Sequence, residues 1–152
     1  MKRFGKGDGG FTMLEIIAVI VVVAVLAAMA FSSMDRNDET VATARAIESQ
    51  LRFAQLKAMS DVEEWGIQVT ADSCTLMYNG IASTTVFMPG ESTSIYNFPS
   101  GVTVSGGTGL IEFDYRGIPS VGGTELIADH SITVAGSPDE TITITQITGF
   151  IQ

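Results

Sequence analysis

One uninterrupted apolar run near the N-terminus constrains this chain more than any other feature. From Ile16 to Phe31 no side chain is polar, and the surrounding segment Phe11 to Met34 has 24 residues. As a helix this segment is about 36 Å long, which is enough to cross the roughly 30 Å hydrocarbon core of a bilayer. A lone strand could not satisfy its backbone hydrogen bonds in lipid, so the run predicts a membrane-spanning helix.

The residues before the run are basic. Residues 1–10 contain Lys2, Arg3, Lys6 and Asp8, a net charge of +2, which the positive-inside rule places on the cytoplasmic side. Inside the segment, Glu15 breaks the apolar pattern. A carboxylate at the bilayer centre costs about 2.5–3.5 kcal/mol, and less near the end of a helix. Either Glu15 lies among lipid headgroups, or it meets a positive partner in an assembly, which is the interpretation we favour.

The residues from Gly10 to Glu15, Gly-Phe-Thr-Met-Leu-Glu, followed by the apolar helix, resemble the signal of type IV pilins and of the pseudopilins of type II secretion. The resemblance implies that a prepilin peptidase cuts between Gly10 and Phe11 and that Phe11 becomes N-methylated. It also implies that Glu15 pairs with the α-amino group of Phe11 on a neighbouring subunit during filament assembly. The pairing is physically reasonable, since two charges that are costly separately in lipid offset one another together.

A second interpretation of the same segment is a secretory signal peptide. Ala28-Met29-Ala30 resembles its cleavage site, and cleavage there would release a soluble domain that begins at Phe31. The apolar run is long for such a signal, and this interpretation leaves Glu15 unexplained.

After the apolar run the helix is expected to continue into a polar region. No proline precedes Pro89 and no glycine lies between Gly10 and Gly66, so we predict a helix from about Thr12 to Ser60, roughly 74 Å long. Apolar residues recur at helical spacing on one face, which should pack on a sheet; they are Ala44, Ile47, Leu51, Ala54 and Ala58. Phe53 and Leu56 project away from this stripe. Either the globular part wraps partly around the helix, or these two residues contact other subunits in a filament.

Beyond Asp61 the apolar period changes from helical spacing to alternation, which predicts strands. The expected strands are Trp65–Ala71, Cys74–Tyr78, Thr84–Met88, Val102–Ser105, Leu110–Tyr115, Ser131–Val134 and Thr141–Ile147, with a short strand near Phe150. The predicted fold class is α+β: a long N-terminal helix, membrane-spanning in its first half, packed against a small antiparallel β-rich head.

Two short patterns in the head resemble the GspH/FimT branch of the pilin superfamily, which contains the minor pseudopilin H and related minor pilins. They are IEFDYRGIPS at 111–120 and the closing ITITQITGFIQ, and LRFAQLKAMS at 51–60 also suits this branch. The resemblance implies a leader peptide at 1–10, a transmembrane and filament-core helix at 11–34, its amphipathic continuation at 35–60, and a periplasmic head at 61–152.

The polar residues of the head do not form a recognisable catalytic or metal site. Glu112 and Asp114 alternate with apolar residues and are expected on a solvated strand face, without a calcium-loop pattern. His130 beside Asp129 lacks a nucleophile motif, and Cys74 is expected to be a small buried residue. The glycine-rich stretch 105–109 joins two predicted strands and opens no helix, which argues against a phosphate site. We therefore expect no enzyme activity and no cofactor.

The charge balance limits the partners. Removing residues 1–10, with three basic groups and one acidic, leaves 5 basic and 16 acidic side chains, which argues against nucleic acid. The family resemblance implies a minor subunit of a type II secretion pseudopilus, first a single-pass inner-membrane protein and then part of the filament. Its partners would be other pilin or pseudopilin subunits, the prepilin peptidase, the inner-membrane assembly platform and membrane lipid. The alternatives are a minor pilin of a type IV pilus or a secreted β-domain cut after Ala30.

Overall fold

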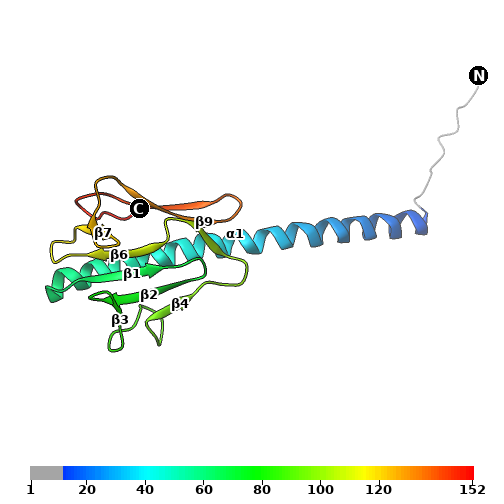
Figure 1. Cartoon of the computed structure of the whole chain (residues 1–152). Coiled ribbons are helices and arrows are strands. Elements are labelled where there is room, and N and C mark those ends of the chain that lie inside the picture. Colours follow the sequence, from blue (N-terminus) through cyan, green and yellow to red (C-terminus); the bar gives the residue numbers. More distant parts are fainter. Residues whose placement is uncertain (1–11) are drawn as a thin grey trace, which may run out of the picture. The chain divides into compact units, whose positions relative to one another are not determined.

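The computed structural model describes the backbone of residues 12–152 and the side chains of 12–29 and 38–152 (Figure 1). One helix, α1, covers Met13–Asp61 and confirms the long helix predicted from the absence of helix breakers. The chain divides into two units, one ending at Asp35 and one beginning at Arg36. The first contains the apolar half of α1, and the second contains the rest of α1 and all the strands.

The strands form two antiparallel sheets. The larger sheet has the order β3-β2-β1-β6-β7-β8, with β4 pairing to β2 as well, and the smaller has the order β10-β9-β5. The strands of the larger sheet are β1 (Trp65–Val69), β2 (Ser73–Tyr78), β3 (Ile81–Ala82), β4 (Ile95–Asn97), β6 (Gly109–Phe113), β7 (Pro119–Val121) and β8 (Thr124–Glu125). Those of the smaller sheet are β5 (Thr103–Gly106), β9 (His130–Ala135) and β10 (Glu140–Ile144).

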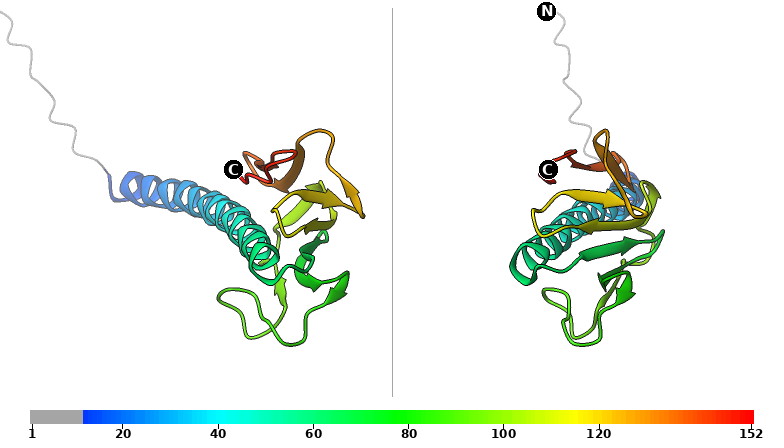
Figure 2. Two further views of the ribbon diagram at one scale, coloured as in Figure 1. Left: turned by 90° about the vertical axis from the view of Figure 1, so that its left-hand side faces the viewer. Right: turned by 60° about the vertical axis from the view of Figure 1, so that its left-hand side comes forward.

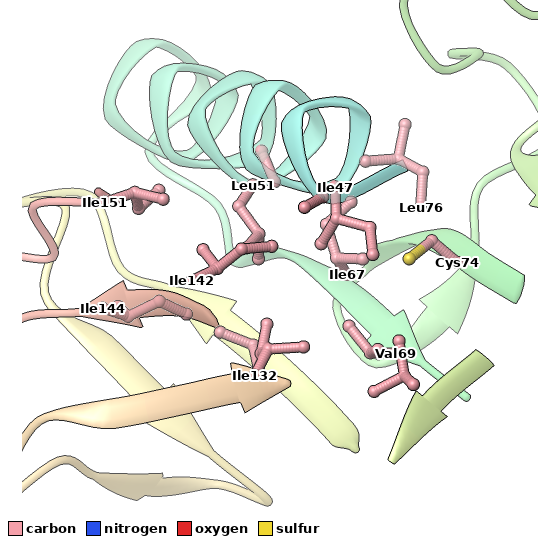
Figure 3. Packing of buried hydrophobic residues seen from close by; sticks show 14 of the residues in the cluster. Ile47, Leu51, Ile67, Val69, Cys74, Leu76, Ile132, Ile142, Ile144 and Ile151 are labelled. Atoms are coloured by element: carbon pink, nitrogen blue, oxygen red, sulfur yellow. The ribbon is translucent and has the colours of Figure 1, made fainter. Parts of the chain in front are cut away.

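The predicted apolar stripe of α1 is the face that meets the sheets. Its members Ala44, Ile47, Leu51, Ala54 and Ala58 are all buried, with exposed fractions of 0–7%. In Figure 3, Ile47 and Leu51 point from the helix toward residues of both sheets, among them Ile67 of β1 and Ile142 of β10. One hydrophobic cluster therefore joins the second half of α1 to both sheets, which lie on one side of it in the views of Figure 2.

Most predicted strands are present, but Thr84–Met88 is wrong because this segment is a loop. The hydroxyl of Ser83 donates to the carbonyl oxygen of Val86 and accepts from its amide, at 2.9 and 3.2 Å, which closes a local turn. A side-chain turn of this kind competes with ladder hydrogen bonds. Met88 is nevertheless buried, so its apolar side chain belongs to the core without a strand. Near Phe150 the predicted strand is reduced to a single bridge between Ile144 and Ile151.

Candidate functional site

The N-terminal end of α1 carries one of the predicted assembly residues. The amide of Glu15 donates to the hydroxyl oxygen of Thr12 at 3.2 Å, so Thr12 is the N-cap of the helix. Glu15 is exposed in the first turn, where a carboxylate interacts favourably with the helix dipole. Gly10 and Phe11, the predicted cleavage and methylation residues, lie outside the described residues.

In the described part of the first unit, residues 12–29, apolar side chains are exposed on every side of the helix. Between Met13 and Met29 each large apolar side chain is 47–87% exposed, and Glu15 is the one charged residue in that stretch. A helix that is apolar all round needs an apolar environment. By length and hydropathy together, none of the helices within the described residues qualifies as a membrane span.

Phe53 and Leu56, the predicted filament contacts, differ in their surroundings. Phe53 is half-buried and packs against the hydrophobic core, whereas the side chain of Leu56 is 65% exposed. The head therefore wraps around the helix as far as Phe53. Leu56 is not covered by the head.

A single side chain of α1 brings the two patterns of the predicted GspH/FimT resemblance together. The side-chain amide nitrogen of Gln55 donates to the carbonyl oxygens of Gly117 at 3.0 Å, Gly149 at 3.1 Å and Thr148 at 3.3 Å. Gly117 lies in the first pattern, IEFDYRGIPS, and Gly149 lies in the second, ITITQITGFIQ. The two glycines are 32 positions apart in the chain and meet on the helix. A Cβ would lie 3.2 Å from the side-chain nitrogen of Gln55 at Gly117 and 2.6 Å from it at Gly149, so both positions favour glycine.

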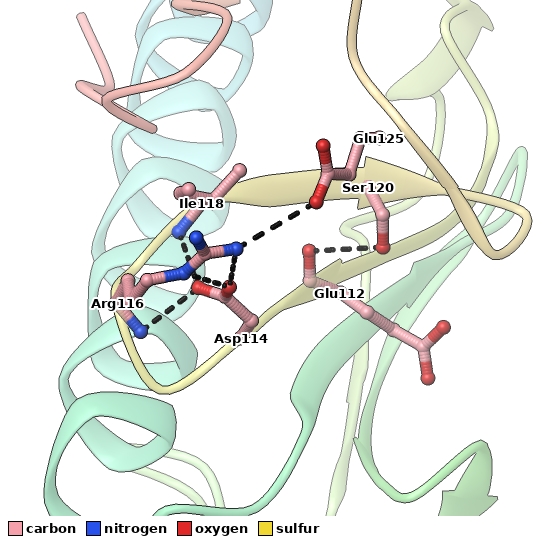
Figure 4. Close-up of polar contacts among 6 residues, drawn as sticks. All are labelled: Glu112, Asp114, Arg116, Ile118, Ser120 and Glu125. Atoms are coloured by element: carbon pink, nitrogen blue, oxygen red, sulfur yellow. Dashed lines mark hydrogen bonds and ion pairs between the residues drawn. The ribbon is translucent and has the colours of Figure 1, made fainter.

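The turn that contains Gly117 is organised by Asp114. Its carboxylate accepts from the backbone amides of Arg116 at 2.8 Å and Ile118 at 2.9 Å, and from the Arg116 guanidinium at 2.8 Å (Figure 4). Burial pushes the pKa of Asp114 upward, but these hydrogen bonds outweigh it and hold the pKa below its usual value. The amide of Gly117 donates to the carbonyl oxygen of Asp114 at 2.8 Å, and Gly117 has φ of 80°, so residues 114–117 form a turn.

The expected solvated face of 111–115 needs correction at three positions. β6 ends at Phe113, so Asp114 belongs to the turn, and Tyr115 is 57% exposed, where alternation placed it inward. Glu112 does point away from the core, but it is only 8% exposed. It covers Gly66 of β1, where a Cβ would lie 2.7 Å from Cγ of Glu112, so the missing side chain of Gly66 makes room for it.

The buried position of Glu112 affects its ionisation. Burial raises the pKa of its carboxyl group, the charge of Glu64 raises it further, and a hydrogen bond from the amide of Gly80 opposes both. Glu64, Glu112, Asp114 and Glu125 line a groove of about 300 Å³. Arg116 lies beside it, 3.7 Å from the carboxylate of Glu125. Within the described residues, no group of three or more His, Cys, Asp or Glu residues is arranged to hold a metal ion.

The remaining reactive residues have structural surroundings. Cys74 is fully buried as predicted, and burial raises the pKa of its thiol to about 12, so it does not supply a thiolate at neutral pH. A ring nitrogen of His130 lies 3.1 Å from the carbonyl oxygen of Gly107, while the carboxylate of Asp129 accepts from the amide of Gln146 at 3.0 Å. Both side chains are used to fix loops. The glycine-rich stretch 105–109 joins β5 to β6, as expected.

Sequence reasoning missed two features of this arrangement. Thr12 and Glu15 form the T-x-x-E pattern of a helix capping box, which was available in the sequence. Gln55 was not recognisable, because its three acceptors are 62 to 94 residues away in the chain.

Comparison with known proteins agrees with this geometry. Residues 5–31 match the prokaryotic N-terminal methylation motif. No curated protein sequence is significantly similar to the chain. The fold of the chain is pilin-like, with one long helix and an antiparallel β-rich head.

Two solved structures have a fold similar to that of the chain. One crystal structure of the type IV minor pilin FimU of Pseudomonas aeruginosa (strain PAO1) matches with a TM-score of 0.54 and 16% identity, over 76% of this chain and 88% of that chain. A second crystal form of the same protein has a TM-score of 0.49 and 14% identity, over 73% and 89%. The first match establishes the pilin-like fold.

Proposed function

We propose that the chain is a minor pilin-like structural subunit of a type II secretion pseudopilus, similar to pseudopilin H, which supports protein secretion by assembling into a filament. The observation that carries the proposal is the N-terminal methylation motif at residues 5–31 on a chain with a pilin-like fold. Cleavage between Gly10 and Phe11 by a prepilin peptidase, followed by methylation of Phe11, is the processing expected from this combination.

Before assembly, the subunit would be anchored in the inner membrane by residues 11–34, with its head in the periplasm. The apolar side chains between Met13 and Met29 support this, because they are exposed and have no core of their own to pack against. The inner-membrane assembly platform would then transfer the helix from lipid into a bundle of similar helices. Both surroundings are apolar, so the exposed apolar side chains are suited to each.

In the filament, Glu15 would pair with the α-amino group of Phe11 of a neighbouring subunit. Its carboxylate is exposed in the first helical turn, so it is accessible to such a partner. A separated carboxylate is costly in an apolar bundle, and pairing removes much of this cost in one register. The pair would therefore fix the axial position of each subunit.

The role proposed for the head is mechanical and does not include catalysis. The second half of α1 is attached to the head by the core cluster and by Gln55, so displacement of this part of the helix carries the head with it.

A second candidate is a minor pilin of a type IV pilus, with a role in assembly or priming. The fold similarity to FimU favours it, since FimU is a type IV minor pilin. The secreted β-domain cut after Ala30 is a third possibility, and it makes a different prediction about the N-terminus.

The test is the intact mass and N-terminal sequence of the native protein from membranes. An N-methylated Phe11 is expected, whereas a chain that starts at Phe31 or retains residues 1–10 would refute the proposal. The proteins that copurify with the mature chain then distinguish between the two filament systems. Secretin-linked secretion components support the pseudopilus, and pilus-retraction components support the type IV pilus.

A further inference from the structure

Strand β4 lies at an edge of the larger sheet. Among the described strands it pairs with β2 alone, and in Figure 1 it lies beyond β2 on the side opposite β1. The amide of Leu76 in β2 donates to the carbonyl oxygen of Ser94 at 2.7 Å. Because alternate residues of an antiparallel strand bond to the same neighbour, Ile95 and Asn97 direct their backbone groups away from β2.

The sequence of this edge favours pairing with a further strand. Residues 92–98, STSIYNF, contain no proline, no glycine and no charged residue. An uncharged segment of this length with high β propensity is typical of sequences that pair strand to strand between molecules. Lysine and proline often protect natural edge strands, and neither occurs in this segment before Pro99. The edge of β4 therefore needs another form of protection.

The side chain of Thr93 occupies the outward backbone groups of Ile95. Its hydroxyl donates to the carbonyl oxygen of Ile95 at 2.8 Å and accepts from the amide of Ile95 at 3.3 Å. A threonine hydroxyl can make both hydrogen bonds at once. The carbonyl oxygen of Thr93 itself accepts from the amide of Met88 at 3.1 Å. Three of the backbone groups that an added strand would need are thus bonded within the chain.

The strand that fits this edge best is the β4 of a second copy of the chain. Ile95 is at the centre of residues 93–97, so two such segments related by a two-fold axis would place Ile95 opposite Ile95. The amide of each Ile95 would then donate to the carbonyl oxygen of the other. These are the two groups that the Thr93 hydroxyl occupies. The side chain of Ile95 is 44% exposed and would lie beside its copy.

We propose that the Thr93 hydroxyl is an autoinhibitory contact, which prevents two copies of this chain from joining their larger sheets edge to edge through β4. Association between copies is thereby left to surfaces other than this edge. The inference goes beyond the proposed function, because it concerns the head alone and is the same for either filament system.

Disulfide trapping in the detergent-solubilised full-length chain tests the contact. The variant I95C reports the symmetric pair, because the Cα atoms of a hydrogen-bonded antiparallel pair are about 5.5 Å apart, which a disulfide can span. Cys74 is fully buried and does not compete. Under mild oxidation we expect T93V/I95C to form about tenfold more disulfide-linked dimer than I95C alone, because valine removes the hydroxyl that occupies the Ile95 backbone groups.

Three matched variants control for other causes of association. T93S/I95C keeps a hydroxyl at position 93, and T84V/I95C removes an exposed threonine hydroxyl elsewhere in the loop before β4. Both should give nearly the same amount of dimer as I95C alone. T93V/T84C carries the cysteine outside the proposed pair and should give little dimer. Association through α1 is common to all the variants, so it does not affect the comparison.

The proposal is overturned if T93V/I95C gives no more dimer than I95C alone, or if T93S/I95C or T84V/I95C gives as much as T93V/I95C. It is also overturned if T93V/T84C gives as much dimer as T93V/I95C. That last result is the one expected of a T93V chain that has lost its fold, because unfolded chains crosslink without regard to position. Thr93 would then support the fold of the loop without controlling the pairing of β4.

Discussion

The side-chain amide nitrogen of Gln55 lies 3.0 Å from the carbonyl oxygen of Gly117, across 62 residues of sequence. The same nitrogen also donates to the carbonyl oxygens of Thr148 and Gly149. One polar group of the helix thereby satisfies acceptors in a turn of the large sheet and in the C-terminal loop. Backbone acceptors of this kind are costly to leave without a donor.

Gln55→Ala should destabilise the head by about 1–2 kcal/mol, since it removes the donor shared by three carbonyl oxygens. Gln55→Glu should be at least as damaging, because it places a carboxylate against those oxygens. Urea unfolding of the full-length chain measures both. Gln68→Ala is the matched control, since the amide of Gln68 makes only a long contact of 3.4 Å with Val69. Equal effects at positions 55 and 68 would contradict the role assigned to Gln55.

Gly149→Ala should be more destabilising than Gly90→Ala. Both glycines have a left-handed backbone, with φ of 61° and 84°, so both substitutions carry a conformational cost of about 1–2 kcal/mol. At Gly149 the added Cβ would also lie 2.4 Å from the carbonyl oxygen of Gly117, whereas at Gly90 no atom lies within 4 Å. Thermal unfolding of the two variants isolates the steric contribution. A Gly90→Ala variant as unstable as Gly149→Ala would show that crowding is unimportant.

The helix stripe and the junction around Gln55 illustrate what the sequence can and cannot reveal. The apolar stripe from Ala44 to Ala58 was predictable because its period is local, and each of its residues is buried as expected. The fold class followed from the change of period after Asp61. The junction of Gly117, Gly149 and Gln55 was not predictable, because no local pattern records which distant carbonyls a helix residue will meet.

Alternation also misled the interpretation at two places where a side chain acts on the backbone. The hydroxyl of Ser83 closes a turn where a strand was expected. Glu112 keeps its predicted direction, but the absence of a side chain at Gly66 lets it lie along the sheet and become buried. Such details depend on neighbouring strands, which the period of a single strand does not contain.

Glu112→Gln should stabilise the head at neutral pH. Burial and the charge of Glu64 raise the pKa of Glu112 in the folded state above its ordinary value of 4.5. The folded state thus binds the proton more tightly, and stability decreases as pH rises from the unfolded pKa through the folded one. Glutamine retains an acceptor for the amide of Gly80 and carries no charge.

Urea midpoints measured between pH 4 and pH 8 test this sign. The urea midpoint of Glu112→Gln should exceed that of the unmodified chain near pH 8, and this difference should become smaller toward pH 4. Glu125→Gln is the control, since that side chain is 71% exposed. An advantage that grows on acidification would mean that the pKa of Glu112 is lowered by its surroundings.

Glu15→Gln and Thr12→Ala should have different effects, because they separate the two roles available to the start of α1. Thr12→Ala removes the hydroxyl that caps the amide of Glu15, at a cost of about 1 kcal/mol to the helix end, but it keeps the carboxylate. Glu15→Gln keeps the cap and removes the charge proposed to pair with the amino group of Phe11. We expect both variants to be processed, Thr12→Ala to enter filaments nearly as well as the unmodified chain, and Glu15→Gln to enter them poorly. Quantitative mass spectrometry of sheared filaments and of membranes measures the ratio of assembled to membrane-bound subunit for each variant. If both variants lose filament incorporation equally, the role of this end of α1 is helix capping. If Glu15→Gln is incorporated as well as the unmodified chain, the proposed pairing of Glu15 with the amino group of Phe11 is contradicted.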